Sequence, residues 1–540
     1  MHPRRRRFAR VATVAALVAL AGCSEDLPTR PGPAPAPEAP RRAVEPYTGL
    51  IRIGVVPSAS SVKVGATASY EVREKETNAL LLTGAAGEVV TVSWTSSASV
   101  TTESRRLQVT CTGSTAERDR RLADGAAAGF PTAAEWVSTA ACWRVYVGER
   151  PLPIDTAAER VYKDKVIAAG QATSDAFWRT VTLTQSLPRY VVTRGNGTQV
   201  LAANPPRVVP STGQVLIAGQ KYRGTAEVQL NSSQSLLAGI NELPMEQYLY
   251  GVVPKELGPV TYPEVEAQRA QAVAARTYAH ANLGKRWSDG YDLGATVSDQ
   301  VYGGYSAEHS VSTAAVNHTA GLVATYGGAL IDALFHATSG GHTAHSEDIF
   351  SGTLAYLRGV WDYPAGAELS STSALLADLR DPTSTTSYEA WHHWHRWNFT
   401  WTMSQISSVI GAYAGRPVGN VLAINVLSRS PTGRVTKIEY VTEEGTFYDT
   451  KGRIRSSLKY IDPATGKATL LPSTLFVIDR LVDASGQTTG YKVYGGGNGH
   501  GIGLSQTGAV GMARAGHTYP QILKKYYTGI AIEQKVGTRS

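Results

Sequence analysis

Cysteine is scarce in this chain, whose 540 residues include only three, at positions 23, 111 and 142. So small a number excludes a cysteine-rich zinc module and a miniature fold held together by many disulfides. The apolar run at the N-terminus is short: Val11 to Ala21 would make about 16 Å of helix, against a hydrocarbon core of about 30 Å, and cannot span a membrane. What is abundant, 42% hydrophobic and 8% aromatic residues with 53 Gly and 27 Pro, is typical of a globular protein with many turns.

A basic head precedes the apolar run, with five arginines between residues 4 and 10. A basic head followed by a short apolar run is typical of a signal peptide. The run ends in Leu20-Ala21-Gly22-Cys23, which resembles a bacterial lipobox, in which the cysteine is acylated and becomes the mature N-terminus. We therefore interpret residues 1–22 as a lipoprotein signal peptide and Cys23 as the lipidation site. The alternative is an ordinary secretory signal with a chance cysteine.

The net charge changes its meaning once this signal is removed. The whole chain has 52 Lys and Arg against 44 Asp and Glu, a net charge of +8. Five arginines leave with the signal, so 47 basic residues face 44 acidic ones, and no nucleic-acid partner is indicated. Residues 23–46 follow, and the seven prolines within 28–46 predict an extended tether. We expect an exported protein that its lipid holds at a membrane.

The folded part is predicted to begin with a β-rich region, residues 47–204. Apolar and polar residues alternate from 51 to 72 and again from 177 onward, which predicts short antiparallel strands. An insert at about 88–150 has a mixed pattern, for which we expect strands at 89–94, 107–111 and 143–147 and helices at 116–129 and 132–140. Helical patterns dominate only later, in the region 205–535. The predicted fold class is α+β, with mixed sheets and packed helices.

Two further features belong to the insert. Cys111 and Cys142 both lie in it, and in an exported protein they predict a disulfide, with two buried free thiols as the alternative. The segment Cys142-Trp143-Arg144-Val145-Tyr146-Val147-Gly148 resembles the last strand of SPOR-type repeats, a family that binds glycan strands stripped of peptides. An unrelated small α/β insertion is the alternative to this SPOR-like reading.

Three sequence blocks carry a stronger resemblance. The first, within 240–279, contains E-x-Y-L-x-G-V-V-x-x-E and A-Q-A-V-A-A-R-T-Y. The second, within 335–343, contains H-x-x-S-G-G, and the third, 499–509, reads G-H-G-x-G-x-S-Q-x-G-A. In residue types and order, these blocks closely resemble the family of stage II sporulation protein D and the amidase enhancers (SpoIID/LytB), and the resemblance implies that residues 205–535 form the catalytic region.

This resemblance implies a lytic transglycosylase of the bacterial cell wall. Such an enzyme cleaves the β-1,4 bond between MurNAc and GlcNAc in peptidoglycan strands that have lost their stem peptides, and it leaves 1,6-anhydro-MurNAc ends without any cofactor. It would work on the outer side of the membrane, facing the wall, with a cell-wall amidase as a partner. The alternative functions are a noncatalytic peptidoglycan-binding factor that enhances an amidase, and a plain hydrolase.

Glu256 is the candidate catalytic residue. Cleaving the glycosidic bond needs a carboxylic acid that protonates the leaving oxygen. A lytic enzyme can work with one carboxyl, because the substrate's own C6 hydroxyl attacks C1 and the same carboxylate takes up its proton. Glu256 matches the position of the family's catalytic Glu, and we expect it in a turn between Pro254 and Pro259, before a helix capped by Thr261. Shielding by Leu257 would raise its pKa; a solvated turn residue is the alternative.

Other polar residues of the blocks are candidates for substrate binding. Glu246, ten positions before Glu256, is interpreted as structural, with an orienting role as the alternative. Six side chains are predicted to bind substrate, with buried support or tight glycine packing as the alternative: Gln271, Arg276 and Tyr278 on the helix, and His500, Ser505 and Gln506 in the third block.

A histidine series and an aromatic stretch complete the candidates. His336, His342 and His345 have a spacing that suits a structural zinc, although relatives that bind zinc here use cysteine as well and this chain has none in the segment. The aromatic residues between 391 and 401 are interpreted as core packing, with a sugar-stacking platform as the alternative. The histidines among them, at 392, 393 and 395, are expected at the surface.

Overall fold

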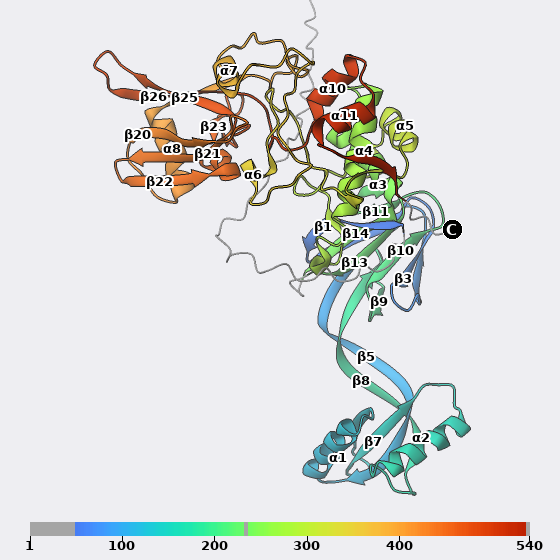
Figure 1. The fold of residues 1–540 in the computed structure, drawn as a ribbon. Coiled ribbons are helices and arrows are strands. Elements are labelled where there is room, and N and C mark those ends of the chain that lie inside the picture. The colour runs from blue at the N-terminus through green and yellow to red at the C-terminus, as the bar shows by residue number, and fades with distance from the viewer. Residues whose placement is uncertain (1–48, 232–235, 536–540) are drawn as a thin grey trace, which may run out of the picture. The chain divides into compact units, whose positions relative to one another are not determined.

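A computed structural model describes residues 49–231 and 236–535, so the predicted signal peptide, Cys23 and the tether lie outside the described residues. The chain divides into two compact units. Unit 1 contains the residues up to Val92, Thr193–Thr198 and those from Pro205 onward, and unit 2 contains Ser93–Val192 and Gln199–Asn204. Helices and mixed sheets alternate along the chain, which confirms the predicted α+β class (Figure 1). None of the helices in the described ranges is long and apolar enough to cross a bilayer.

Unit 1 begins with a seven-stranded sheet. Its strands in spatial order are β15 Leu293–Gly294, β1 Leu50–Ala59, β14 Leu237–Pro244, β13 Thr225–Leu230, β10 Pro206–Pro210, β3 Tyr70–Glu74 and β4 Leu80–Gly84. The predicted alternation is present in β1, where Ile51 and Ile53 are fully buried. β1 pairs antiparallel with β14, and β14 leads directly into a helix. A second sheet includes β5 Val89–Thr112 and continues from it in the order β2 Ser61–Ala66, β11 Val215–Ile217 and β12 Gln220–Tyr222.

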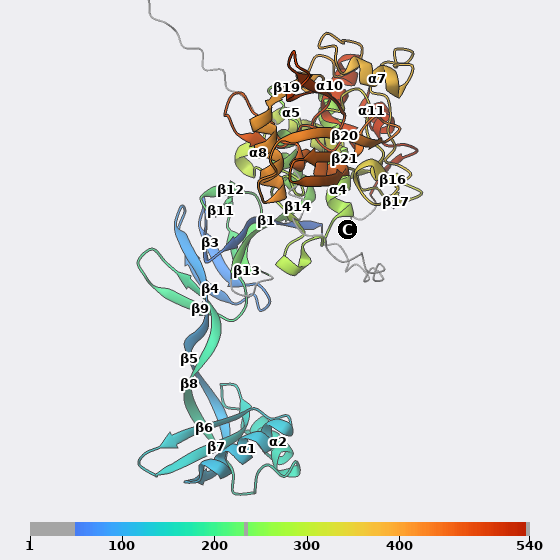
Figure 2. The same cartoon turned by 90° about the vertical axis from the view of Figure 1, so that its left-hand side faces the viewer.

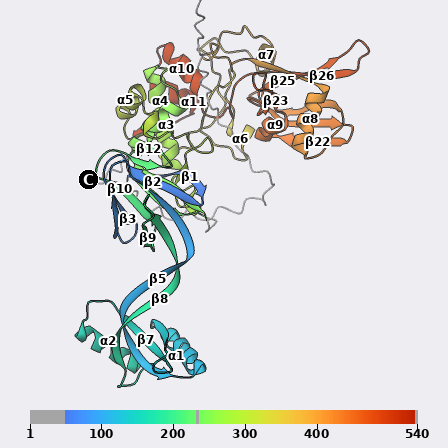
Figure 3. The ribbon, with the colours of Figure 1, turned by 180° about the vertical axis from the view of Figure 1, so that it is seen from behind.

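The central element of unit 1 is the buried helix α4, Val265–Ala281. Four helices pack against α4: α3 Met245–Glu256, α5 Ser310–His318, α10 Gln506–Arg514 and α11 Tyr519–Tyr526 (Figures 1 and 3). Small buried residues on α4 allow the close approach, among them Ala267, Ala270 and Ala274. Short strands complete this core: β16 Leu322–Tyr326, β17 Ala329–Leu330, β18 Phe335–His336, β27 Leu504–Ser505 and β28 Ala531–Gln534.

The stretch between β18 and β27 builds a second core within unit 1. Its elements are α6 Ser346–Ile349, α7 Thr372–Asp378, β19 Trp397–Thr402, α8 Met403–Ala414, β20 Val421–Arg429, β21 Val435–Thr442, β22 Gly445–Thr450, α9 Ile454–Ser457, β23 Tyr460–Ile461, β24 Ala468–Thr469, β25 Phe476–Val482 and β26 Thr488–Gly495. Trp397 and Trp401 lie in this core, as predicted, whereas Trp391 is exposed. The expectation of surface histidines is wrong at His392 and His395, which are buried because their loop packs inward, where Nδ1 of each ring meets the hydroxyl of Thr338 or Ser387.

Unit 2 is a small α/β unit that the chain enters within β5 and leaves within β8. Its elements after β5 are α1 Thr115–Ala127, β6 Thr132–Val137, β7 Cys142–Arg150, α2 Thr156–Ala168, β8 Phe177–Thr193 and the short β9 Gln199–Ala202. The strand order is β8-β5-β7-β6, a βαββαβ arrangement in which both helices contact β7 (Figure 2). Many unrelated families share this topology, so a SPOR-like identity stays a prediction.

The structure corrects the insert in three ways. The predicted helix at 132–140 is wrong: β6 pairs with β7 residue by residue from Thr132 to Val137, and this pairing overrides the helix propensity of its alanines. The strands expected at 89–94 and 107–111 are one strand, β5. The unit continues to Val192, beyond the expected end near residue 150. The predicted disulfide is confirmed, since Cys111 and Cys142 are bonded with their Cα atoms 5.6 Å apart.

Candidate active site at the end of helix α3

Glu256 is the last residue of α3, and its side chain points into the protein. The helix continues through Pro254, and Leu257 after Glu256 is extended. The expected turn between two prolines is therefore wrong for Glu256 itself, and the following helix begins at Val265 instead of Thr261. The Gln268 amide explains the later start, because its Nε2 donates to the carbonyls of Leu257 and Tyr262 and holds the loop between the helices. Glu256 is only 6% exposed.

The surroundings of Glu256 suit a group that changes its protonation near neutral pH. Burial raises the pKa of Glu256 to about 7, although two hydrogen bonds favour its ionised form. One comes from the backbone N–H of Val301, 2.7 Å from Oε1, and the other from the side chain of Gln506. Tyr248 lies close on the same helix, and burial followed by the charge of Glu256 raises its pKa, so the phenol stays neutral. A carboxyl with a pKa near 7 can donate a proton and then accept one.

The segment around Val301 was not found from the sequence, yet it holds the donor to Glu256 in place. Gln300 is fully buried: its Oε1 accepts from the Tyr248 hydroxyl at 3.2 Å and its Nε2 donates to the Ala275 carbonyl at 3.2 Å. The carboxylate of Asp299 is buried between two cations, Lys285 at 2.8 Å and Arg286 at 2.7 Å. A loop segment has no periodic pattern from which burial could be predicted. The only signal in the sequence is the adjacent carboxylate and amide of Asp299 and Gln300.

Gln271 and Gln506, each predicted to bind substrate, lie next to each other, and substrate binding by either stays a prediction. Gln506 begins α10 and is 6% exposed, and its Nε2 lies 3.4 Å from Oε1 of Gln271. Gln271 on α4 is fully buried, and its Nε2 has no partner among the described residues. The carboxamide of Gln506 is thus the one next to the Glu256 carboxyl, and Gln271 positions it by accepting its hydrogen bond.

Arg276 is a structural residue, which corrects its predicted role in substrate binding. Its guanidinium is completely buried and forms a two-pronged ion pair with Glu246, with distances of 2.8 and 2.6 Å. The remaining donors reach the carbonyls of Val316 and Leu322 and the hydroxyl of Thr319. The structural interpretation of Glu246 is consistent with this ion pair. Its position along the helix did not reveal that Arg276 pairs with Glu246.

The third block packs against the second through paired strands. β18 and β27 are parallel, with Phe335 opposite Leu504 and His336 opposite Ser505. Ser505 is fully buried and caps α10, accepting from the Gly508 N–H at 3.2 Å, so it offers no surface to a ligand and its predicted role in substrate binding is wrong.

A glycine of this block is required for close packing. Gly501 has φ +85°, and a Cβ there would lie 2.3 Å from Cζ of the buried Arg434. The alternative reading of the block, glycines that permit tight packing, therefore holds at this position.

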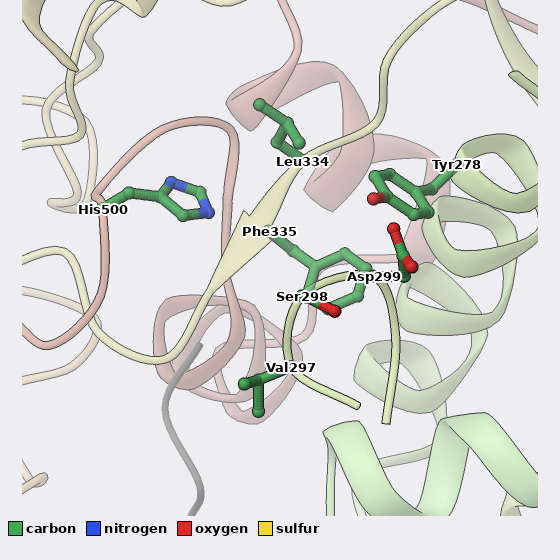
Figure 4. A pocket seen from close by; sticks show the side chains of 7 residues that line it. All are labelled: Tyr278, Val297, Ser298, Asp299, Leu334, Phe335 and His500. Atoms are coloured by element: carbon green, nitrogen blue, oxygen red, sulfur yellow. The ribbon is translucent and has the colours of Figure 1, made fainter. Parts of the chain in front are cut away.

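A small pocket lies beside the loop that bonds to Glu256. Its lining consists of Tyr278, Val297, Ser298, Asp299, Leu334, Phe335 and His500, around a cavity of about 50 Å³ (Figure 4). The Tyr278 hydroxyl lies close to the Asp299 carboxylate in this view and accepts from Lys285 Nζ at 3.1 Å. His500 is buried and its pKa is held well below the ordinary value, so the ring is neutral. Two of the predicted binding residues, Tyr278 and His500, thus line the pocket.

The predicted zinc site is not formed. Each of the three histidines bonds within its own surroundings: Nδ1 of His336 donates to the Ile502 carbonyl, Nδ1 of His342 donates to the Thr343 carbonyl, and Nδ1 of His345 accepts from the Gly359 N–H. Across residues 49–231 and 236–535, no group of three or more His, Cys, Asp or Glu side chains is placed to hold a metal ion. The residues present do not fit the metal, because the three side chains are not gathered around one point with other possible ligands, although only Nδ1 of each ring is bonded and Nε2 of His336 has no partner among the described residues.

Two family models match parts of the region that contains these features. The family model "Stage II sporulation protein" matches residues 233–326, and a model described as a domain of unknown function (DUF8618) matches residues 344–503. An uncharacterized protein of Brachyspira hyodysenteriae is 30% identical over 295 residues, covering 54% of this chain and 67% of that protein.

Two named relatives come from Bacillus subtilis. The amidase enhancer is 28% identical over 369 residues, 63% of this chain and 48% of its own length, so the chain spans about half of that relative. Stage II sporulation protein D is 27% identical over 314 residues, 55% of this chain and 76% of its own length.

Proposed function

Because the chain belongs to the family of stage II sporulation protein D and the amidase enhancer, we propose that it is a peptidoglycan lytic transglycosylase. Its substrate would be glycan strands without stem peptides, cleaved at the β-1,4 bond between MurNAc and GlcNAc. The observation that supports this proposal is the buried carboxyl of Glu256, with a pKa raised to about 7 beside an amide donor.

The proposed reaction uses Glu256 twice. The protonated carboxyl gives its proton to the leaving glycosidic oxygen, and the bond from C1 to that oxygen breaks as an oxocarbenium-like state develops. The C6 hydroxyl of the same MurNAc then bonds to C1 and passes its proton to the Glu256 carboxylate, which restores the acid. Val301 and Gln506 stabilise the carboxylate between the two steps.

The partners of Glu256 agree with a mechanism that needs one carboxyl. In the described part of the chain they are a backbone N–H and a carboxamide, and neither can act as a second carboxylate that activates water or attacks C1. The proposed product is therefore a 1,6-anhydro-MurNAc end and no hydrolysed end. No cofactor enters this sequence of proton transfers.

The proposal extends to where the protein works. An exported lipoprotein, anchored through Cys23 and extended by the proline-rich tether, would place the catalytic region at the cell wall. An amidase that removes stem peptides would supply the substrate and is the proposed partner. The relative named amidase enhancer favours a second function, a noncatalytic peptidoglycan-binding factor that stimulates such an amidase.

One experiment separates these functions. Purified protein is incubated with peptide-free glycan strands, and the products are identified by mass spectrometry. A lytic transglycosylase gives anhydro ends that are lighter than hydrolysed ends by one water, and Glu256→Gln abolishes them while the exposed control Glu444→Gln does not. A binding factor gives no anhydro ends with the purified protein, and a hydrolase gives reducing ends; either result overturns the proposal.

A further inference from the structure

Glu389 is a fully buried carboxylate that lies outside all three sequence blocks. It sits in the loop before β19, within the stretch matched by the domain of unknown function and outside the 233–326 match. Its two oxygens accept hydrogen bonds from the second and third blocks: Ser339 N at 2.8 Å, Gly340 N, Gly341 N at 2.9 Å and the Ser505 hydroxyl at 2.9 Å. One carboxylate thus joins the Ser339-Gly340-Gly341 segment of the second block (the S-G-G turn) to the start of α10.

A second buried carboxyl keeps this arrangement at a single negative charge. Asp362 accepts from the Tyr526 hydroxyl at 2.6 Å and lies 3.1 Å from the Ser339 hydroxyl. Burial and then the charge of Glu389 raise the pKa of Asp362 well above its ordinary value, so Asp362 is neutral. Burial also opposes the charge on Glu389, but hydrogen bonds from the His395 ring and the Ser339 N–H outweigh it and hold the pKa of Glu389 low; burial lowers the pKa of His395 itself, so its ring acts as a neutral hydrogen-bond donor. Glu389 is therefore ionised and Asp362 carries the proton.

The hydroxyl of Ser505 connects Glu389 to the active site. Ser505 caps α10 by accepting a hydrogen bond from Gly508 N, and its hydroxyl donates a hydrogen bond to Glu389. Gln506 is the next residue; its Nε2 lies 3.4 Å from Oε1 of Gln271 beside Glu256, and its carboxamide favours the ionised form of Glu256 and lowers the pKa of that carboxyl. The direction of the Gln506 carboxamide depends on where α10 begins, and that point is fixed by Ser505.

We propose that Glu389 is a positioning residue of the active site, which holds Ser505 and so aims the Gln506 carboxamide at Glu256. The role rests on the proposed function, because it matters for catalysis only if Glu256 is the general acid. It also assigns a task to the stretch between the second and third blocks: that stretch supplies the anion on which both blocks are fixed.

The consequence for Glu256 follows from the Gln506 hydrogen bond. That bond favours the carboxylate, so its loss leaves burial less opposed and the pKa of Glu256 rises. Tyr248 faces Glu256 from α3, and Asp299 lies near Tyr248 in its pair of cations. Neither Tyr248 nor Asp299 contacts Glu389, because Tyr248 bonds to Gln300 and Asp299 pairs with Lys285 and Arg286. A substitution at Glu389 therefore leaves both groups in place.

The test measures the titration of Glu256 in the full-length protein. The protein is labelled with ¹³C at the glutamate carboxyls, and the resonance lost in Glu256→Gln identifies Glu256. Gln506→Ala should move its titration to higher pH, and Glu389→Gln should move it by the same amount. Glutamine at 389 turns an amide N–H₂ toward backbone N–H groups that need an acceptor, so it cannot hold Ser505 and the S-G-G turn together. The double variant with Gln506→Ala and Glu389→Gln should titrate at the same pH as either single variant.

Asp362→Asn is the matched control, because an amide can replace a carboxyl that is already neutral. In this variant Glu256 should titrate at the same pH as in the wild type. A merely structural Glu389 would lower the melting temperature and leave the Glu256 titration where it is, which overturns the proposal. If Glu389→Gln does not fold, Ser505→Ala replaces it: removing this hydroxyl should also raise the titration, and an unchanged titration refutes the role.

These readouts need no substrate. Failure of the wild type to release anhydro ends would therefore overturn the proposed function without deciding the titration.

Discussion

Replacing Glu256 with glutamine is expected to stabilise the folded protein at alkaline pH. Burial raises the pKa of Glu256 from 4.5 to about 7. Between these two values the folded chain keeps a proton that the unfolded chain has released, so the free energy of unfolding falls as the pH rises through this window. Above it, the buried carboxylate costs the fold about 3 kcal/mol, since each pKa unit corresponds to about 1.4 kcal/mol. Glutamine is neutral at every pH and retains an oxygen that can accept from Val301 N–H.

The assay is calorimetric unfolding of wild type and variant at about pH 4 and about pH 8.5, on either side of the window. The transition of unit 1 should be equally stable in both proteins in acid, and the variant should gain about 3 kcal/mol in alkali. Glu444→Gln, at an exposed position, should show no such difference. The same stability gap at both pH values would refute the raised pKa and with it the case for Glu256 as an acid that works at neutral pH.

Three further outcomes are expected. Glu246→Ala should lower the free energy of unfolding by about 3 kcal/mol in urea titrations, because it leaves the buried guanidinium of Arg276 without its counter-ion; retained stability would contradict the structural role of this ion pair. Gly501→Ala should lower the melting temperature far more than Gly486→Ala, since both have positive φ but only the first places a Cβ against Arg434; equal losses would mean that backbone strain alone decides. Reducing the disulfide of unit 2 should destabilise that unit by about 3 to 4 kcal/mol and leave the melting of unit 1 unchanged, and a joint loss would contradict their division.

The sequence was informative where a residue's role is carried by its neighbours along the chain. Glu256 was found because its block is contiguous, and β1 was found because alternation is a local pattern. The contact between Gln271 and Gln506 was not predictable in this way, because 235 positions separate them. The predicted disulfide needed only the export context and two cysteines in one insert.

The misassignments arose where the role depends on a distant partner. Arg276 was assigned to substrate because nothing in its own helix reveals Glu246 as its counter-ion. The segment at 132–140 was taken for a helix because its alanines favour one, while its pairing with β7 decides otherwise. No sequence motif around Glu389 indicates its role, because its hydrogen-bond donors lie about fifty positions before it and more than a hundred after it.

The parallel pairing of β18 with β27 has a consequence for the order in which the protein matures. Glu256 is synthesised near the middle of the chain, but the amide beside it belongs to Gln506, which emerges almost at the end. Chains grow from the N-terminus, and contacts that close long loops form late. A nascent or truncated chain therefore has the carboxyl without the group that tunes it, so the proposed capacity to cut glycan strands would arise only when synthesis is nearly complete. The topology itself would keep the incomplete chain inactive.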